Sequence, residues 1–276
     1  MFFPMENVLA AMPTISIFPS EIIQGEPLKI TVEGVSGLAP VKKITFADKT
    51  LNVFLHQGKP TALVGVDLNK KPGTYQIVVY LSDGVSIEKT VTVGAREKVE
   101  APLGIPDKLG GNTPTAAKQV VNTLALENQS IYSVRAFGRA LWTEDFKWPI
   151  YQPIVVTDSY GYSRQTVGYS ITHKGTDFRA KEGTVVSAMN RGIVRIARTY
   201  QIYGKTVIID HGLGLHTVYM HLSKIKVNEG ELVKAGQLIG LSGKTGYAES
   251  PHLHLSVWIS GVSIDPMKFM ELLAVE

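Results

Sequence analysis

The chain has 276 residues, 44% of them hydrophobic, with seven histidines and no cysteine. Its length exceeds that of a typical domain and predicts two folded units, each with enough apolar residues for a core of its own. The absence of cysteine excludes disulfides and thiolate metal ligands. The formal net charge of +4 is a modest basic excess, which suits contact with an anionic surface. This excess is too diffuse to indicate nucleic-acid binding, so we expect no nucleic-acid partner.

The sequence shows neither a membrane-spanning segment nor a complete export signal. No run of about eighteen apolar residues is present, so we expect no helix that crosses a membrane. Residues 1–13 end in small residues, but they lack a basic n-region and contain Glu6. This segment is therefore at best a truncated secretion signal.

The first part of the chain, residues 14–94, has the pattern of short β-strands separated by turns. Six strands are predicted, at residues 15–18, 28–32, 41–46, 61–66, 75–81 and 87–93. Pairs such as Pro72-Gly73 and Asp83-Gly84 mark the turns. Short strands at this spacing predict an immunoglobulin-like β-sandwich. Because it contains no catalytic residue cluster, we expect an accessory or spacer domain.

Residues 95–142 are predicted to be a linker that contains one helix. The start of this segment is charged and contains proline and glycine. Thr113 is a suitable N-cap and Pro114 suits the first helical position, while Val120 and Leu124 belong to an apolar stripe at helical spacing. The pattern predicts one amphipathic helix whose apolar stripe packs against one of the β units.

Residues 143–276 are predicted to form a Gly-rich antiparallel β domain, so the fold class of the chain is mainly β. The clearest strands are predicted at residues 185–189, 193–198, 206–209, 217–221 and 254–259. Positive φ angles or close backbone approaches are expected at Gly192, Gly204, Gly212, Gly214, Gly230, Gly236, Gly243 and Gly246. A groove across such a sheet would accommodate an extended peptide.

Three short segments of this domain contain the chemistry of a metal site. They are His-Lys-Gly-Thr-Asp (173–177), Tyr-Met-His-Leu (219–222) and Pro-His-Leu-His-Leu (251–255), with His173, Asp177, His221, His252 and His254 as the functional candidates. A catalytic zinc ion takes three protein ligands of these types and leaves a fourth position open for water. The segments therefore supply a zinc site and two further imidazoles.

The spacing of these residues indicates how they would meet. His252 and His254 are two apart in a strand pattern, so both imidazoles point to one face and enter one site. Gly175 predicts a turn that leaves a strand, and such a turn can bring His173 and Asp177 to one ion. The chain has no His-Glu-x-x-His segment, so a glutamate base of that type is absent and the base is expected to be a histidine. Spacing alone leaves open which of the paired histidines binds the metal.

At these residues the chain resembles the lysostaphin-type (LytM-like) zinc metallopeptidases, which cut peptide cross-links in bacterial cell walls. The resemblance covers about residues 156–267 and includes, in the expected order, segments 158–164, 173–178, 183–188, 204–212, 217–222, 233–240 and 251–255. It implies that His173, Asp177 and His254 bind Zn²⁺, with His221 and His252 as unligated catalytic residues. The loop before Pro251 departs mildly, because relatives more often have a further glycine before Pro-His.

The resemblance implies a zinc-dependent endopeptidase that hydrolyses peptide cross-links of peptidoglycan. Such an enzyme acts outside the cytoplasm, in the periplasm or cell wall, and we expect a monomer. Some relatives have lost metal ligands and activate other wall enzymes, so the alternative is a catalytically silent scaffold that recruits or activates another hydrolase. Residues 183–194 and 227–240 also resemble half-motifs of biotinyl and lipoyl carrier domains, but the required lysine hairpin between the halves is missing.

Three further histidines are given no catalytic role. His211 is expected to tie down a turn at a strand end. His216 is expected to face solvent or the rim of the cleft. His56 lies in the N-terminal half, far from the candidate site in the sequence.

Overall fold

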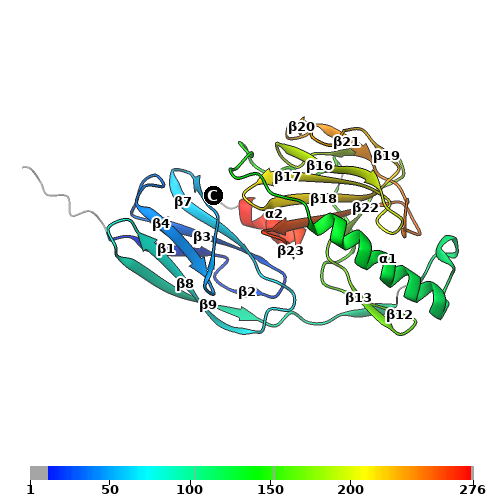
Figure 1. The fold of residues 1–276 in the computed structure, drawn as a ribbon, viewed down its shortest axis with the longest axis horizontal. Helices are drawn as coiled ribbons and strands as arrows, with labels where there is room; N and C mark the ends of the chain where they lie inside the picture. Colours follow the sequence, from blue (N-terminus) through cyan, green and yellow to red (C-terminus); the bar gives the residue numbers. More distant parts are fainter. Residues whose placement is uncertain (1–11, 103, 152, 275–276) are drawn as a thin grey trace, which may run out of the picture. The chain divides into compact units, whose positions relative to one another are not determined.

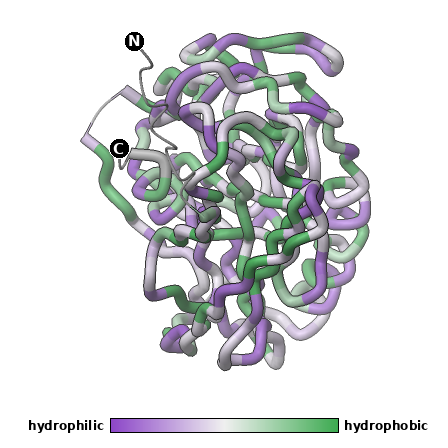
Figure 2. Tube along the Cα trace, turned by 90° about the vertical axis from the view of Figure 1, so that its left-hand side faces the viewer, coloured by the Kyte–Doolittle hydropathy of each residue, from purple (hydrophilic) through white to green (hydrophobic). Residues whose placement is uncertain are grey.

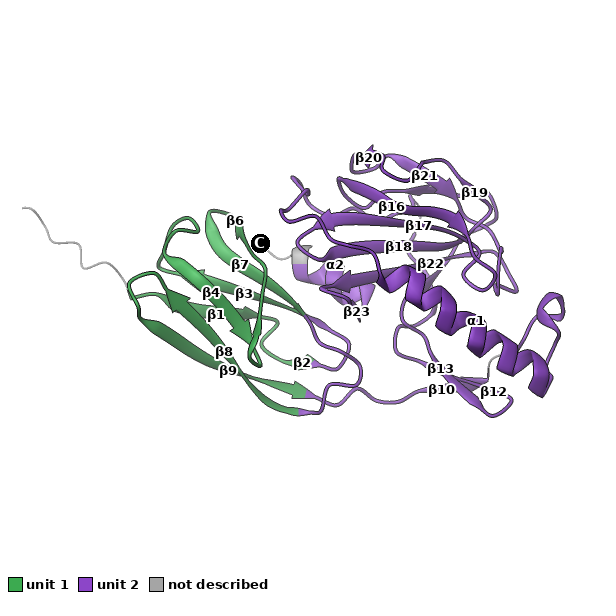
Figure 3. Ribbon diagram, in the orientation of Figure 1, with its two compact units in different colours: residues 1–22, 28–64, 73–93 green, residues 23–27, 65–72, 94–276 purple. Residues whose placement is uncertain are grey.

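The structure is a computed structural model that describes residues 12–102, 104–151 and 153–274 (Figure 1). Most of the expected secretion signal therefore lies outside the described residues. The chain divides into two compact units, shown in Figure 3. The first contains residues up to 22, 28–64 and 73–93, and the second contains residues 23–27, 65–72 and 94 onwards.

The first unit is built from two sheets. Its strands are β1 (Thr14–Phe18), β2 (Ile22–Ile23), β3 (Pro27–Glu33), β4 (Val41–Phe46), β5 (Lys49–Thr50), β6 (Val53–His56), β7 (Lys59–Gly65), β8 (Gly73–Leu81) and β9 (Ser86–Gly94). The sheet orders are β1-β3-β7-β6 and β2-β9-β8-β4-β5. The six predicted strands are present, and β2, β5 and β6 are additional. The immunoglobulin-like shape and the domain boundaries stay predictions.

Period-2 alternation explains why these segments form strands with one buried face. Leu28, Ile30 and Val32 are fully buried on β3, and Ile77 and Val79 are fully buried on β8. Successive side chains of a strand point to opposite faces, so each run of alternate apolar residues supplies a core face. The changes of hydropathy along the chain can be followed in Figure 2.

The predicted helix is present as α1 (Pro114–Tyr132) and belongs to the second unit. The Thr113 side chain accepts a hydrogen bond from the Ala116 amide at 3.2 Å, and proline occupies the first turn, as predicted. Two buried groups of apolar residues hold the helix: Val120 packs near Ile202, and Ile131 belongs to the cluster around β17 and β18. Neither described helix has the length and hydropathy of a bilayer-spanning segment.

An eight-stranded sheet forms the centre of the second unit. Its strands are β11 (Val156–Asp158), β14 (Thr176–Arg179), β16 (Gly192–Thr199), β17 (Lys205–Gly212), β18 (Leu215–Leu222), β20 (Leu232–Val233), β22 (His252–Ile259) and β23 (Val262–Ile264). The order is β11-β14-β22-β18-β17-β16-β20, with β23 paired to β22, and the pairs are antiparallel. The mainly β fold class is therefore confirmed.

Two three-stranded sheets and two short helical segments complete the unit. One small sheet contains β10 (Glu100–Pro102), β12 (Ser163–Thr166) and β13 (Tyr169–Thr172), and the other contains β15 (Val185–Ser187), β21 (Leu238–Leu241) and β19 (Lys224–Ile225). A short 3-10 helix spans Asp107–Leu109, and α2 spans Pro266–Ala274. The strand pattern predicted from the sequence omitted most of these small sheets, because most of their strands are short or polar.

Strand β18 is buried along its whole length. One face contributes Val218 and Met220 to the cluster that includes Ile131 of α1. On the opposite face, the Tyr219 hydroxyl contacts the Met189 amide at 3.0 Å. Burial on both faces explains why the sequence of this strand lacks a clear polar and apolar alternation.

The glycine predictions for this unit hold at all eight positions. Positive φ angles occur at Gly204, Gly212, Gly214, Gly230, Gly236 and Gly246. Gly192 and Gly243 are instead sites of close approach: a β-carbon at Gly243 would lie 2.6 Å from the Ser223 amide nitrogen. Backbone geometry at these positions therefore favours glycine.

Candidate metal centre

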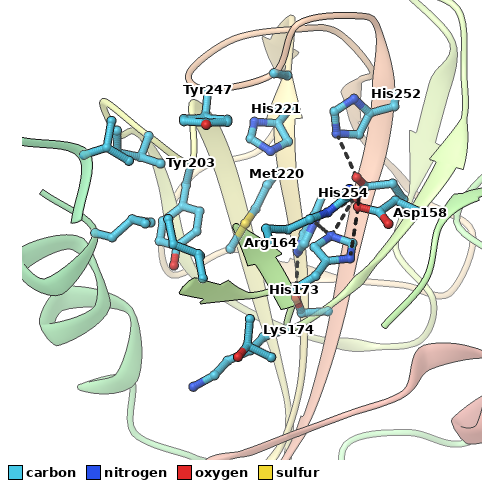
Figure 4. A pocket seen from close by; sticks show the side chains of 18 of the residues that line it. Asp158, Arg164, His173, Lys174, Tyr203, Met220, His221, Tyr247, His252 and His254 are labelled. Carbon is cyan, nitrogen blue, oxygen red and sulfur yellow. Dashed lines mark hydrogen bonds and ion pairs between the residues drawn. The ribbon is translucent and has the colours of Figure 1, made fainter. Parts of the chain in front are cut away.

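The side chains of His173, Asp177 and His254 converge on one point in the second unit. Figure 4 shows the two histidines of this group close together. His173 lies in the turn between β13 and β14, while Asp177 on β14 is directly opposite His254 on β22. The Asp177 Oδ1 atom is 2.8 Å from His254 Nδ1 and 3.2 Å from His173 Nε2, and the two nitrogens are 3.1 Å apart. Ligands about 2.0–2.1 Å from a tetrahedral zinc lie roughly 3.3 Å from one another. The spacing therefore fits a metal ion.

The other nitrogen of each imidazole has its own partner. His173 Nδ1 is 2.9 Å from the Ser159 carbonyl oxygen, and His254 Nε2 is 3.0 Å from Ser256 Oγ. When His173 Nδ1–H donates to the carbonyl, its Nε2 presents a lone pair to the site. Partners of this kind fix the tautomer and ring orientation of histidines that bind metals.

The electrostatics of the centre favour the protonation states that bind a metal. Burial raises the pKa of Asp177, but the contacts with His173 and His254 outweigh this effect and hold the pKa well below its ordinary value. Burial lowers the pKa of His254. An anionic carboxylate beside a neutral imidazole is the state in which both can act as ligands.

Gly175 leaves room for the His254 ring. A β-carbon at this position would overlap His254 Nε2, and it would lie 2.6 Å from both His254 Cε1 and the Leu255 carbonyl oxygen. The expected turn between His173 and Asp177 is thus confirmed, and it connects two strands. Glycine is needed there because of the close packing against β22.

His221 and His252 lie beside the three converging side chains, with their ring centroids 5.0 Å apart. His221 Nδ1 is 2.9 Å from the Thr245 carbonyl oxygen, and His252 Nδ1 is 2.9 Å from the Ser250 carbonyl oxygen. With Nδ1–H donating, each ring keeps a lone pair on Nε2. Burial, followed by the charges of His252 and His254, lowers the pKa of His221 to about 3. The low pKa keeps His221 neutral, so its Nε2 is a hydrogen-bond acceptor at the site.

All five candidate residues meet at one cavity of about 880 Å³. Its walls also include Arg164 on β12, Tyr247, and residues of α1 such as Leu124 and Asn128. Arg164 forms an ion pair with Asp158, which lies 3.6 Å from His173 Nδ1. The sequence pattern gives no sign that these residues line a site. The amphipathic pattern of α1 indicated packing, but it contained no signal that one part of the helix would border the cavity.

The remaining histidines of this unit are structural. His211 is buried, with Nδ1 2.8 Å from the Arg191 carbonyl oxygen and Nε2 2.8 Å from Thr217 Oγ1, so it ties neighbouring segments together. The prediction that His216 faces solvent or the cleft rim is wrong. His216 is only 5% exposed and lies near Asp210 and Trp258, because β18 is covered on both faces.

Comparisons with known proteins agree with this arrangement. Residues 171–266 match Peptidase family M23. Peptidoglycan DD-endopeptidase ShyA of Vibrio cholerae is 33% identical over 206 residues, which is 70% of this chain and 46% of that protein. Lysostaphin of Staphylococcus simulans is 40% identical over 119 residues, which is 41% of this chain and 24% of that protein.

A solved structure extends the similarity beyond the matched segment. A candidate M23 peptidase of Pseudomonas aeruginosa is similar with a TM-score of 0.65 and 27% identity, over 91% of this chain and 95% of that one. The chain spans about half the length, or less, of the curated relatives that it matches. Together, the ordered motifs and these matches show that residues 171–266 form a Peptidase M23 domain, related to the lysostaphin-type enzymes.

Proposed function

We propose that the chain is a zinc-dependent endopeptidase that hydrolyses peptide cross-links of bacterial peptidoglycan. The observation that supports this most strongly is the convergence of three metal-binding side chains and two further imidazoles at one cavity. The relative ShyA is called a peptidoglycan DD-endopeptidase, which fits this proposal.

In this proposal the metal ligands are His173 Nε2, Asp177 Oδ1 and His254 Nδ1. One carboxylate and two imidazoles suit zinc, and the chain offers no cysteine that would favour a softer metal. When bound, zinc supplies a Lewis acid that activates water and polarises a carbonyl group. The carbonyl of Ser159 and the hydroxyl of Ser256 keep the two imidazoles in the orientation that this binding requires.

The two other imidazoles perform the proton transfers. In hydrolysis, the water oxygen bonds to the scissile carbonyl carbon, the carbon–nitrogen bond breaks, and the departing nitrogen gains a proton. Nε2 of His221 or His252 accepts the proton from the attacking water and returns a proton to the leaving amine. Hydrogen bonds from Nδ1 to backbone carbonyls hold both rings in a suitable tautomer.

The substrate is proposed to be a D-alanyl cross-link to a diamino acid. The DD-endopeptidase ShyA matches 206 residues of the chain, whereas lysostaphin matches 119. Because peptidoglycan lies outside the cytoplasmic membrane, this activity requires an extracytoplasmic location. We propose that the chain acts there as a monomer.

The test is mass spectrometry of fragments released from purified peptidoglycan of several cross-link types. We expect release of uncross-linked fragments from D-alanyl cross-linked material, and loss of this activity when a chelator removes the metal. Release only from glycine-bridged material would reject the proposed bond. Stoichiometric zinc without release from any material would favour the scaffold alternative.

A further inference from the structure

Helix α1 places a buried carboxylate against a loop of the catalytic domain. Glu127 is only 7% exposed. Its Oε1 atom accepts hydrogen bonds from the amides of Gln201 and Ile202 at 2.6 and 3.0 Å, and its Oε2 atom accepts from Ile202 and Tyr203 at 3.2 and 3.1 Å. Burying a carboxylate costs desolvation free energy unless the group is hydrogen-bonded. The hydrogen bonds from these three consecutive amides offset that cost.

The same loop holds the backbone of His221. The amide of His221 donates to the Tyr203 carbonyl oxygen at 3.1 Å. His221 has a φ of 59°, a left-handed conformation that is uncommon outside glycine and needs support from its surroundings. The Tyr203 hydroxyl donates to Asn128 Oδ1 at 2.8 Å, so two adjacent residues of α1 hold the loop that supports His221. Figure 4 shows Tyr203 and His221 beside Met220 at the site.

The loop also contacts the segment that orients the His221 ring. The Thr245 carbonyl accepts from His221 Nδ1, and the Thr245 hydroxyl accepts from the Lys205 amide at 2.9 Å. The Tyr247 amide donates to the Ile202 carbonyl at 2.8 Å. A shift of the loop would therefore disturb both the backbone and the ring of His221.

The direction of the peptide groups gives Glu127 a specific task. The amides of residues 201–203 point to its carboxylate, while the carbonyls of Ile202 and Tyr203 accept from Tyr247 and His221. Apolar residues such as Ile131 already attach the helix to the sheet. A carboxylate adds what apolar packing lacks, because it fixes the orientation of these amides. The Tyr203 amide shares its peptide group with the Ile202 carbonyl, and the Tyr203 carbonyl that accepts from His221 belongs to the next peptide group.

We propose that Glu127 is a positioning residue for His221, acting through residues 201–203, and that α1 is therefore part of the catalytic apparatus. Helix α1 lies outside the segment that matches the M23 family, residues 171–266. The catalytic consequence rests on the proposed function of His221. The structural consequence, order in the loop and at the His221 amide, does not depend on it.

The test compares Glu127→Gln with the matched control Leu126→Gln in the full chain. The substituted glutamine side chain would keep the size of glutamate but would turn one acceptor oxygen into a donor that faces backbone amides. Leu126 is the preceding helical residue and is 66% exposed. Zinc content, kcat and KM on a small cross-linked peptide, and amide hydrogen exchange of the metal-free chain are measured for each variant.

For Glu127→Gln we expect roughly 10–100-fold faster exchange at the amides of residues 201–203 and 221, the factor for loss of a hydrogen bond to a charged group. We also expect kcat to fall by at least about tenfold, with zinc content unchanged and KM within about twofold, as for loss of an interaction made in the transition state. The control should match the wild-type chain in all of these measurements.

Several outcomes would overturn the proposal: unchanged exchange at residue 221, an unchanged kcat, or a fall in kcat that only follows loss of zinc. If Glu127→Gln fails to fold, Glu127→Asp supplies a milder test, because it keeps the charge and withdraws the carboxylate from the amides by one methylene group. Faster exchange at residues 201–203 and 221 is again expected, and its absence would refute the proposal. If the wild-type chain cleaves no peptidoglycan, the proposed function fails, while hydrogen exchange still decides whether Glu127 orders His221.

Discussion

Asp177 and His254 face each other across two neighbouring strands, with Oδ1 and Nδ1 2.8 Å apart. The ladder between β14 and β22 thus sets the separation of two candidate ligands. His252 is two residues before His254 on β22, so both side chains point to the same face of the sheet. A register shift of one residue would turn both imidazoles away from the site, so the register of the sheet determines the chemistry of the centre.

Replacing Asp177 by alanine should abolish stoichiometric zinc binding and activity together. The change removes one of only three proposed protein ligands and the anion of the set. It should also abolish the rise in melting temperature that zinc gives the wild-type chain, since a ligand stabilises the folded state by an amount that grows with the logarithm of its affinity. Elemental analysis and thermal unfolding check both effects. A full equivalent of zinc in the variant would show that the ligand assignment is wrong.

Replacing His221 by alanine should have a different effect. The zinc content should stay at one equivalent, because His221 is outside the proposed ligand set. Activity should fall by ~10²–10⁴-fold, the contribution of a positioned acid or base. Steady-state rates and elemental analysis on the same sample separate the two effects, and a loss of zinc would place His221 among the ligands.

Replacing Gly175 by alanine should disrupt the centre without changing a candidate ligand. The added methyl group would overlap the His254 ring and approach the Leu255 carbonyl. We expect weaker zinc binding and a large loss of activity. Gly138→Ala is a suitable control, because a β-carbon there meets nothing within 4 Å. Equal zinc affinity of the two variants, measured by competition with a chelator, would contradict this account of the turn.

Stability should depend on pH through His211. Burial lowers its pKa from 6.5 to about 4. Between these values only the unfolded chain takes up the proton, so stability is full above about pH 6.5 and falls as the pH falls towards 4. From pH 7 to pH 5.5, the wild-type chain should lose about 1 kcal/mol more stability than His211→Gln. Urea unfolding of both metal-free proteins measures this difference, and equal losses would remove His211 as the cause.

The sequence was sufficient to predict the mainly β fold, α1 and the residues that meet at the centre, because those features have local signals. Strand β14 was missed because it is short and polar on one face. The expectation for His216 failed because burial of β18 on both faces is a property of the whole sheet. Glu127 was missed for a similar reason: a glutamate on a helix is usually solvated, and its amide partners are more than 70 residues away in the chain.

The packing of α1 also determines which part of the second unit can be transferred into a fusion protein. The Phe137 amide donates to Asp210 Oδ2 and the Leu141 amide to the His211 carbonyl, so the segment after the helix is also tied to the central sheet. A gene fusion that begins at the edge of the family match, residue 171, would leave these acceptors and the apolar surface under α1 without their partners. The smallest transplantable piece therefore begins ahead of Thr113, well before the segment that matches the family.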